Sequence, residues 1–197
     1  MSLSPIEELS EILSKLPSLG KRSAKRVILE LIEKREEKLL PLIDGLTNLR
    51  DQVCVCPVCG NFDTSSPCSI CASEKRNVGT LCLVENVAEL WAMERTQIYN
   101  GKYHVLGGLL SAINGVRPQD LNTKNLLSRI GEEKINEVIF ALPATMEGKT
   151  TQHYIKDLLK ENGVKVTEIA HGVPFGGELD YLDEGTIGEA FKHRKPS

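Results

Sequence analysis

The segment CPVCGNFDTSSPCSIC, residues 56–71, decides how the chain is organised. It contains two C-x-x-C pairs, Cys56 with Cys59 and Cys68 with Cys71, separated by eight residues. Zinc prefers four soft ligands at the corners of a tetrahedron, and each C-x-x-C turn supplies two thiolates on one edge of it. The spacing predicts one zinc ion per chain. We expect this zinc to be structural, because four thiolates leave no coordination position open for a substrate.

Two other interpretations of the cysteines remain open. The pairs could be redox-active thiols or disulfides, although cytosolic thiols normally stay reduced. Cys54 lies close enough along the chain to replace one of the four ligands. Cys82, in contrast, falls within an apolar strand pattern and is expected to be a small buried residue.

The composition changes on either side of this segment. Residues 54–77 hold few large apolar side chains, so a metal cross-link would have to replace a core. We therefore predict a multi-domain α/β protein with four regions: a helical domain at 1–53, the zinc finger at 54–77, an α/β domain at 78–172, and a glycine-rich segment and tail at 173–197.

Residues 1–50 have helical periodicity. The first predicted helix has one apolar face, whose members are mostly spaced three and four apart: Ile6, Leu9, Ile12, Leu13 and Leu16. Pro17–Gly20 break this pattern. A second apolar face follows, made by Ala24, Val27, Ile28 and Leu31, and a third helix is expected over about 38–50.

Four cations gather within six residues at the start of the second predicted helix: Lys21, Arg22, Lys25 and Arg26. Arg22 and Arg26 fall roughly opposite the apolar face, with Lys25 on its flank. The segment LPSLGKRSAKRV, residues 16–27, resembles a helix-hairpin-helix motif, which holds the nucleic-acid backbone without reading its sequence. The four cations are therefore candidate DNA contacts. A solvated basic face is the alternative.

Strands and helices alternate after residue 79. We predict strands at 80–85, 103–106, 137–142 and 164–170, separated by helices at 87–96, 122–131 and 150–161. Such alternation indicates right-handed crossovers and a mostly parallel, four-stranded sheet. The net charge of −3 argues against a protein coated with basic charge, but it allows a local basic patch. No apolar run approaches the roughly 20 residues of a membrane span, so we expect a cytosolic protein.

The order of hairpin, four-cysteine finger and α/β unit resembles the RecR family of bacterial recombination-repair proteins. The resemblance covers almost the whole chain and is carried by LPSLGKRSAKR, CPVCGN…CSIC, LCLVE, GKYHVLGG, NEVIFALPATMEGKTT and VTEIAHGVPFGGELDYLDEGT. It implies a Toprim fold for residues 79 to about 172. It also implies recombinational repair of gapped DNA or of single-strand/double-strand junctions, the partners RecO and RecF, dimers that assemble into ring-like tetramers, and a cytoplasmic, nucleoid-associated location.

Toprim enzymes hold Mg²⁺ with a Glu after the first strand and a D-x-D pair after a later one. Glu85 matches the first position, and Glu147 lies in the segment that matches the later motif. The D-x-D positions fall on Pro143 and Thr145, which supply no carboxylate. We therefore expect a DNA-binding scaffold or clamp with no catalytic residue, in which Glu85 and Glu147 could form an acidic patch for a partner protein. A Mg²⁺-dependent nuclease or primase-like enzyme is the alternative, and an adaptor that touches DNA only through its partner is a third hypothesis.

Two further features carry no enzymatic prediction. The segment GGELDYLD, residues 176–183, resembles the Walker-B-like stretch of the family, but the sequence contains no G-x-x-x-x-G-K-[ST], so ATP hydrolysis is not expected. His104 and His171 have no serine or cysteine nucleophile beside them in a recognisable motif. Hydrolase chemistry is therefore not expected either.

Overall fold

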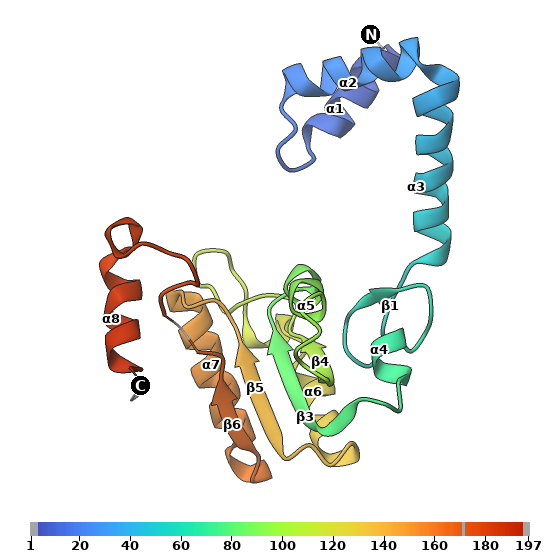
Figure 1. Cartoon of the computed structure of the whole chain (residues 1–197). Coiled ribbons are helices and arrows are strands. Elements are labelled where there is room, and N and C mark those ends of the chain that lie inside the picture. The colour runs from blue at the N-terminus through green and yellow to red at the C-terminus, as the bar shows by residue number, and fades with distance from the viewer. Residues whose placement is uncertain (1–3, 171, 195–197) are drawn as a thin grey trace. The chain divides into compact units, whose positions relative to one another are not determined.

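The computed structural model describes residues 4–170 and 172–194 of the chain (Figure 1). The chain divides into two compact units between Val53 and Cys54. Unit 1 holds the N-terminal helices, and unit 2 holds the four-cysteine segment, the sheet and the C-terminal segment. In the described ranges, no helix is both long enough and apolar enough to cross a membrane.

Unit 1 is entirely helical. It consists of α1 (Pro5–Ser14), α2 (Lys21–Glu33), a π-helical turn (Arg35–Leu39) and α3 (Leu40–Gln52). The helix α1 begins at a capping box, because the Ser4 hydroxyl accepts a hydrogen bond from the Glu7 N–H while the Glu7 carboxylate accepts one from the Ser4 N–H. The predicted break at residues 17–20 lies in the turn between α1 and α2.

Unit 1 has a very small core. The residues buried in its described part are Ser10, Ala24, Ile28 and Leu31. Val27, which the periodicity places on the apolar face of α2, is exposed instead. Most of the predicted apolar face of α1 is exposed as well, since Ser10 rather than a large side chain is the residue that α1 buries.

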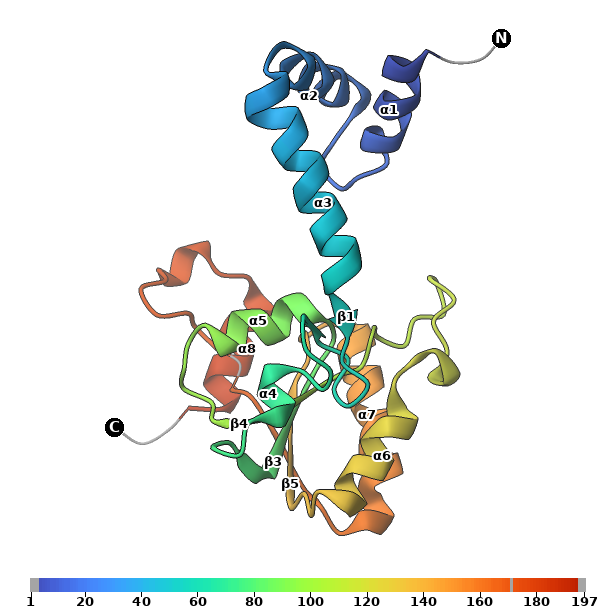
Figure 2. The same cartoon turned by 90° about the vertical axis from the view of Figure 1, so that its right-hand side faces the viewer.

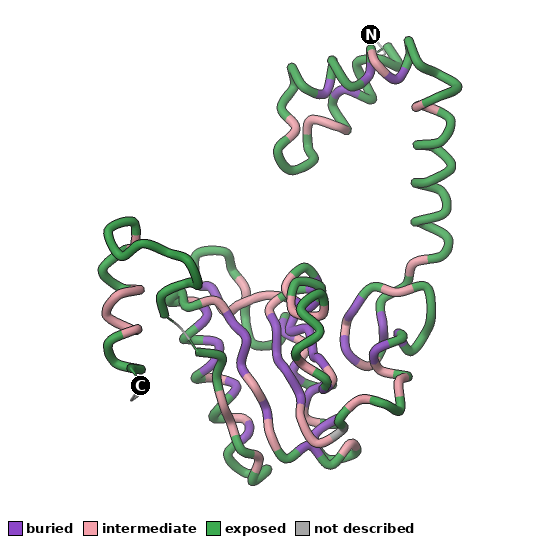
Figure 3. The backbone as a smooth tube through the Cα atoms, viewed as in Figure 1, coloured by how far each residue is buried: buried purple, intermediate pink, exposed green. Residues whose placement is uncertain are grey.

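The helix α3 contains no buried residue at all (Figure 3). Its exposed apolar side chains are Leu40, Leu42, Ile43, Leu46 and Leu49. A globular helix normally buries such side chains against a neighbour, because transfer from water stabilises them by roughly 25 cal/mol per Å². Among the described residues of unit 1, no element buries these side chains.

Unit 2 begins with the four-cysteine segment and continues into an α/β fold. The segment forms a hairpin of β1 (Cys54–Val55) and β2 (Phe62–Asp63), followed by the short helix α4 (Ser69–Ala72). The α/β part contains β3 (Asn77–Val84), α5 (Val87–Glu94), β4 (Gly101–Val105), α6 (Thr123–Glu132), β5 (Glu137–Ala141), α7 (Met146–Leu159), β6 (Lys165–Glu168) and α8 (Glu184–Lys192), with 3₁₀ turns at Pro118–Asp120, Lys160–Asn162 and Leu179–Tyr181.

The four strands lie in the order β4-β3-β5-β6, and every neighbouring pair is parallel. The predicted fold class, with a mostly parallel four-stranded sheet, is confirmed. Two helices differ from the prediction. The helix α7 begins at Met146 rather than near residue 150, because the Thr145 side chain caps it by accepting a hydrogen bond from the Gly148 N–H at 3.1 Å. The helix α8, capped by Asp183, was not predicted.

The sheet is covered on both faces (Figure 2). Successive residues of β3 alternate between the two faces, so Leu81 and Leu83 join one core cluster while Cys82 and Val84 join the other. The first cluster includes side chains of α6 and α7. The second includes side chains of α5 together with Cys56, Cys59 and Cys68. Three of the four cysteines are thus part of the core of the sheet.

Candidate metal centre and basic hairpin

The four cysteines of the two C-x-x-C pairs converge in unit 2. Their Sγ atoms all lie within 4.8 Å of one another, and the Sγ atoms of Cys59 and Cys68 are 3.5 Å apart. Zn–S bonds of about 2.3 Å in a tetrahedron place the sulfurs about 3.8 Å apart. Cys56, Cys59 and Cys68 are buried and Cys71 is half-buried. The donor set and its spacing therefore fit a zinc ion with four thiolate ligands.

The backbone around the cysteines is arranged for thiolate ligands. The Asn61 N–H donates to Cys59 Sγ and the Cys68 N–H donates to Cys56 Sγ, each at 3.4 Å. Gly60 adopts a φ of +81°, and a Cβ at this position would lie 3.2 Å from Cβ of Val105. The first turn therefore requires glycine for both its conformation and its contact with β4.

The pKa values of the clustered thiols are shifted in opposite directions. The hydrogen bond from Cys71 lowers the pKa of Cys59 to about 5. Burial raises the pKa of Cys68 to about 11, and the hydrogen bond to Cys59 raises that of Cys71 still further. Without a metal ion, the Cys59 thiol would thus lose its proton far more readily than the thiols of Cys68 and Cys71. A divalent ion would stabilise the remaining negative charges.

The other two cysteines lie outside this cluster. Cys54 is exposed, and its thiol donates to the carbonyl oxygens of Asp63 at 3.4 Å and Ser65 at 3.7 Å. Cys82 is buried in the sheet, and burial raises its pKa to about 12, which makes it an unreactive packing residue.

The cluster of four cysteines is hydrogen-bonded directly to the edge of the sheet. The Val105 N–H of the edge strand β4 donates to the Cys59 carbonyl at 2.8 Å, and the Asn125 side chain donates to the Pro57 carbonyl at 3.3 Å. On the other side, Nε1 of Trp91 in α5 donates to Oδ1 of Asn61 at 3.0 Å. The cysteine segment is therefore joined by hydrogen bonds to the sheet and to the helices beside it.

The four predicted DNA contacts lie at the start of α2, and all are exposed. Within the part of the chain that the structure describes, none of them forms an ion pair. The N-cap of α2 is Gly20, which supplies no capping side chain, so backbone N–H groups of the first turn are available to an anion. Ser18, in the turn before α2, takes a φ of +64°.

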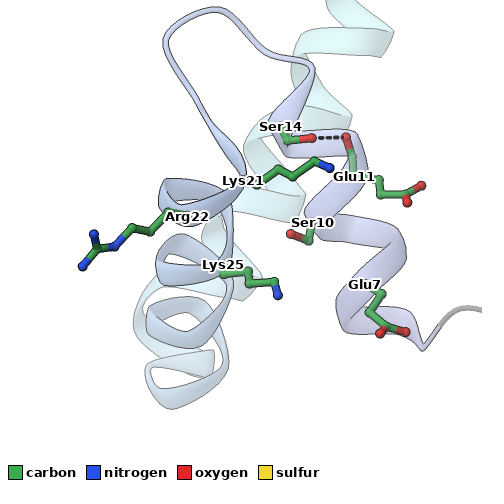
Figure 4. A pocket seen from close by; sticks show the side chains of 7 residues that line it. All are labelled: Glu7, Ser10, Glu11, Ser14, Lys21, Arg22 and Lys25. Atoms are coloured by element: carbon green, nitrogen blue, oxygen red, sulfur yellow. Dashed lines mark hydrogen bonds between the residues drawn. The ribbon is translucent and has the colours of Figure 1, made fainter.

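The cations do not all face the same way (Figure 4). Lys21, Arg22 and Lys25 line a cavity of about 450 Å³ whose other wall is α1, with Glu7, Ser10, Glu11 and Ser14. Lys21 and Lys25 extend toward the α1 wall, whereas Arg22 points away from it. Hydrogen bonds with Ser4 lower the pKa of Glu7, and the charge of Lys25 adds a smaller effect. Acidic side chains of α1 therefore offset part of the positive potential on one side of α2.

The Toprim acidic positions are not arranged as a metal site. Glu85 is half-buried, and burial together with the neighbouring Glu89 raises its pKa. Glu147 lies in the first turn of α7. Apart from the four cysteines, no group of three or more His, Cys, Asp or Glu side chains within the described ranges is placed to hold an ion.

The two positions of the missing D-x-D pair have a structural role instead. Thr145 caps α7, and a Cβ added to Gly148 would lie 1.9 Å from the Pro143 carbonyl oxygen. Pro143, Thr145 and Gly148 therefore form a tight strand-to-helix turn. Neither Pro143 nor Thr145 supplies a carboxylate to this turn.

His104 is fully buried between β4 and α6. Its Nε2 lies 2.7 Å from the Asn122 carbonyl oxygen and its Nδ1 lies 3.4 Å from Nη1 of Arg129, which is itself buried and paired with Glu133. Burial lowers the pKa of His104 to about 4. It is a neutral core residue, while His171 lies outside the described residues. The sequence patterns did not single out Arg129, Asn61 or Trp91.

Comparison with protein families matches nearly the whole chain. The matching families are described as RecR helix-hairpin-helix at residues 6–50, RecR four-cysteine zinc finger domain at 53–73, Toprim domain at 79–170 and RecR C-terminal at 172–195. Their order is the order of the helical unit, the cysteine cluster, the parallel sheet and the C-terminal segment.

Curated relatives match over their full length. The chain is 50% identical to recombination protein RecR of Erythrobacter litoralis, covering 100% of this chain and 99% of the relative, and 51% identical to that of Novosphingobium aromaticivorans with the same coverage. It is 50% identical to recombination protein RecR of Rhodospirillum rubrum, covering 100% of both. The resemblance inferred from the sequence is confirmed: the chain belongs to the RecR family of recombination proteins.

Proposed function

We propose that the chain is a non-enzymatic DNA-binding scaffold of recombinational DNA repair, which grips DNA through the hairpin of unit 1. The observation that carries this proposal is the start of α2, where four exposed cations, none of them ion-paired within the described residues, lie at a first turn without a side-chain cap. Both kinds of donor suit phosphate oxygens rather than base edges. Binding should therefore be independent of sequence and should weaken steeply as salt increases.

The chain acts as a homodimer or homotetramer in this proposal. Support comes from the exposed apolar side chains of α1, α2 and α3 in a unit with almost no core of its own. A second copy would remove this surface from water. Several copies of one hairpin would then bind the same DNA molecule, and their individually weak contacts would reinforce one another through effective concentration.

The metal in this proposal is structural. One zinc ion per chain would be held by Cys56, Cys59, Cys68 and Cys71. It would cross-link the β1–β2 hairpin and α4 beside the edge of the sheet. Zinc content is measured by elemental analysis of purified protein. About one equivalent per chain is expected, and a folded preparation without metal contradicts the assignment.

Glu85 and Glu147 serve as a patch for a partner protein in this proposal, and the candidate partners are RecO and RecF on gapped or junction DNA in the nucleoid of the cytoplasm. The lack of carboxylates at Pro143 and Thr145 supports a role without phosphoryl transfer. Incubation with plasmid and Mg²⁺ tests this point. Nicking that Glu85→Ala abolishes would favour a Toprim enzyme instead.

DNA titration with two double variants tests the hairpin. Arg22→Ala/Arg26→Ala should weaken the binding of labelled duplex by about tenfold or more, because two phosphate contacts are lost from each chain. Lys34→Ala/Lys38→Ala is the matched control, since it removes the same charge from unit 1 but from lysines that Glu30 already pairs. Equal affinities of the two variants would exclude the hairpin as the grip.

A further inference from the structure

A groove lies between the four-cysteine segment and α5, and the proposed function uses none of the residues that line it. Its volume is about 410 Å³. Two aromatic side chains line it, Phe62 from β2 and Trp91 from α5, together with the charged residues Asp63, Arg76 and Glu94. Aromatic residues make up only 5% of the chain, so a concave surface with two of them is unusual here.

Both aromatic rings are open to solvent and at least one is held in place. Phe62 is 46% exposed and Trp91 is 51% exposed, although both are large and apolar. The Trp91 indole N–H donates to Oδ1 of Asn61 at 3.0 Å, and Asn61 is almost fully buried. The Trp91 ring is therefore oriented in advance, which lowers the entropic cost of binding a ligand.

The charges of the groove leave it negative. Arg76 is mostly buried, forms an ion pair with Glu94 and also donates to the Gly101 carbonyl at 3.1 Å, so these two charges cancel. The Asp63 carboxylate accepts hydrogen bonds from Thr64 N at 2.7 Å and from Ser69 N and Ser69 Oγ at 2.8 Å, and the hydrogen bonds from Ser69 contribute most to lowering its pKa to about 2. Within the described part of the chain no cation pairs with Asp63, and its carboxylate stays charged.

We propose that this groove binds an arginine side chain from a basic segment of a partner protein. A guanidinium group is planar, stacks on aromatic faces and is drawn to a carboxylate, which matches Phe62, Trp91 and Asp63. A nucleic-acid base could stack on the same rings, but its phosphates would meet Asp63 and the exposed part of Glu94. The surface therefore suits a protein partner and is separate from the hairpin.

Trp91 is the one tryptophan of the sequence, so its fluorescence reports on the groove alone. The zinc-loaded full chain is titrated with a short arginine-glycine peptide and, as control, with the same peptide carrying neutral citrulline in place of arginine. The proposal expects a saturable change with the arginine peptide and a much weaker one with citrulline. No saturable change, or equal changes with both peptides, would overturn it.

Two variants of exposed Phe62 separate the aromatic contact from general charge attraction. Phe62→Tyr keeps the ring and should bind the arginine peptide as the original chain does, whereas Phe62→Leu should bind about fivefold more weakly. Equal zinc content and melting temperature of both variants show that the fold is intact. Equal affinities of the two variants would overturn the proposal.

Two other occupants give different results. If single-stranded DNA causes the same saturable change in Trp91 fluorescence, the groove is a stacking platform for bases. If the fluorescence changes with protein concentration in the absence of peptide, a second copy of the chain fills the groove. Either result would overturn the proposal that the groove binds an arginine side chain of a partner protein.

Discussion

The two units differ in where their stability comes from. In β3 of unit 2, four consecutive residues, Leu81 to Val84, have no exposed surface at all. In the described part of unit 1, α3 runs through Leu40–Gln52 without burying one residue. The sheet thus has a closed core, to which Cys56, Cys59 and Cys68 contribute. The helices of unit 1 leave apolar and basic surfaces open, as expected for the part that meets other molecules.

Metal removal should give the largest effect, because it acts on the core of unit 2. Cys59→Ser takes away a ligand whose backbone is also bonded to β4, and we expect it to lower the free energy of unfolding of unit 2 by more than about 5 kcal/mol. Cys54→Ser, which lies outside the cluster, is the control and should change little. Zinc content and thermal unfolding of both variants are the measurements. Full zinc binding by Cys59→Ser would contradict the ligand assignment.

Leucine truncation compares the two units directly. Leu83→Ala leaves a cavity in the closed core of the sheet and should cost about 2–5 kcal/mol of unfolding free energy, independent of protein concentration. Urea unfolding followed at two protein concentrations measures this cost. A cost below about 1 kcal/mol would mean that the sheet is less tightly packed than its burial indicates.

Leu46→Ala makes the same truncation on the exposed surface of α3. If a second copy covers this surface, the variant should shift the mass of the assembly toward smaller species while the sheet unfolds as before. Light scattering or sedimentation gives the mass. An unchanged assembly together with unchanged stability would show that this part of α3 does not hold the oligomer together.

Acid should destabilise unit 2 through His104. Its pKa in the folded chain is about 4, below the ordinary value of 6.5, so the unfolded chain takes up the proton first as the pH falls. The contribution of His104 to the free energy of unfolding is therefore fully present above about pH 6.5. It is lost progressively toward pH 4, by about 3 kcal/mol in total. His104→Gln should flatten this part of the curve of unfolding free energy against pH. Parallel curves for both proteins would contradict the burial of a neutral imidazole.

The acidic wall of α1 should tune DNA binding slightly. Glu11 lines the cavity that Lys21 and Lys25 share, so Glu11→Gln should raise DNA affinity by about twofold by removing a charge that competes with phosphate. Glu8→Gln removes the same charge from a residue of α1 that does not line the cavity. Fluorescence anisotropy with labelled duplex compares them. A gain from Glu8→Gln equal to that from Glu11→Gln would show that only net charge matters.

Local patterns predicted the fold because they coincide with burial. The apolar runs at 80–85 and 137–142 became β3 and β5, the central strands, which are covered on both faces. The helix α8 was missed because Gly185 and Gly188 weaken its helical pattern, and only the Asp183 cap indicates where it begins. The periodicity of α1 indicated a helix correctly, but it could not indicate that Ser10 would be the buried residue, since burial depends on the neighbouring helix.

The candidate sites also differ in how much of them local sequence patterns could predict. The C-x-x-C spacing itself requires each pair of sulfurs to lie close together, so the clustering of the four cysteines could be predicted from the sequence alone. The contact of Asn61 with Trp91 joins residues 30 positions apart, and the pairing of Arg129 with His104 joins residues 25 apart. No local pattern records such contacts. Lys21 faces α1 whereas Arg22 does not, and this difference depends on where α1 lies, which periodicity does not give.

The salt dependence of DNA binding tests the central claim, that unit 1 supplies the grip while unit 2 provides a metal-stabilised frame. DNA affinity is measured over a series of salt concentrations for the original chain and for Arg22→Ala/Arg26→Ala. The slope of log affinity against log salt should become shallower by about 0.9 for each phosphate contact removed. An unchanged slope with unchanged affinity would contradict the claim, because the phosphate contacts would then lie elsewhere on the chain.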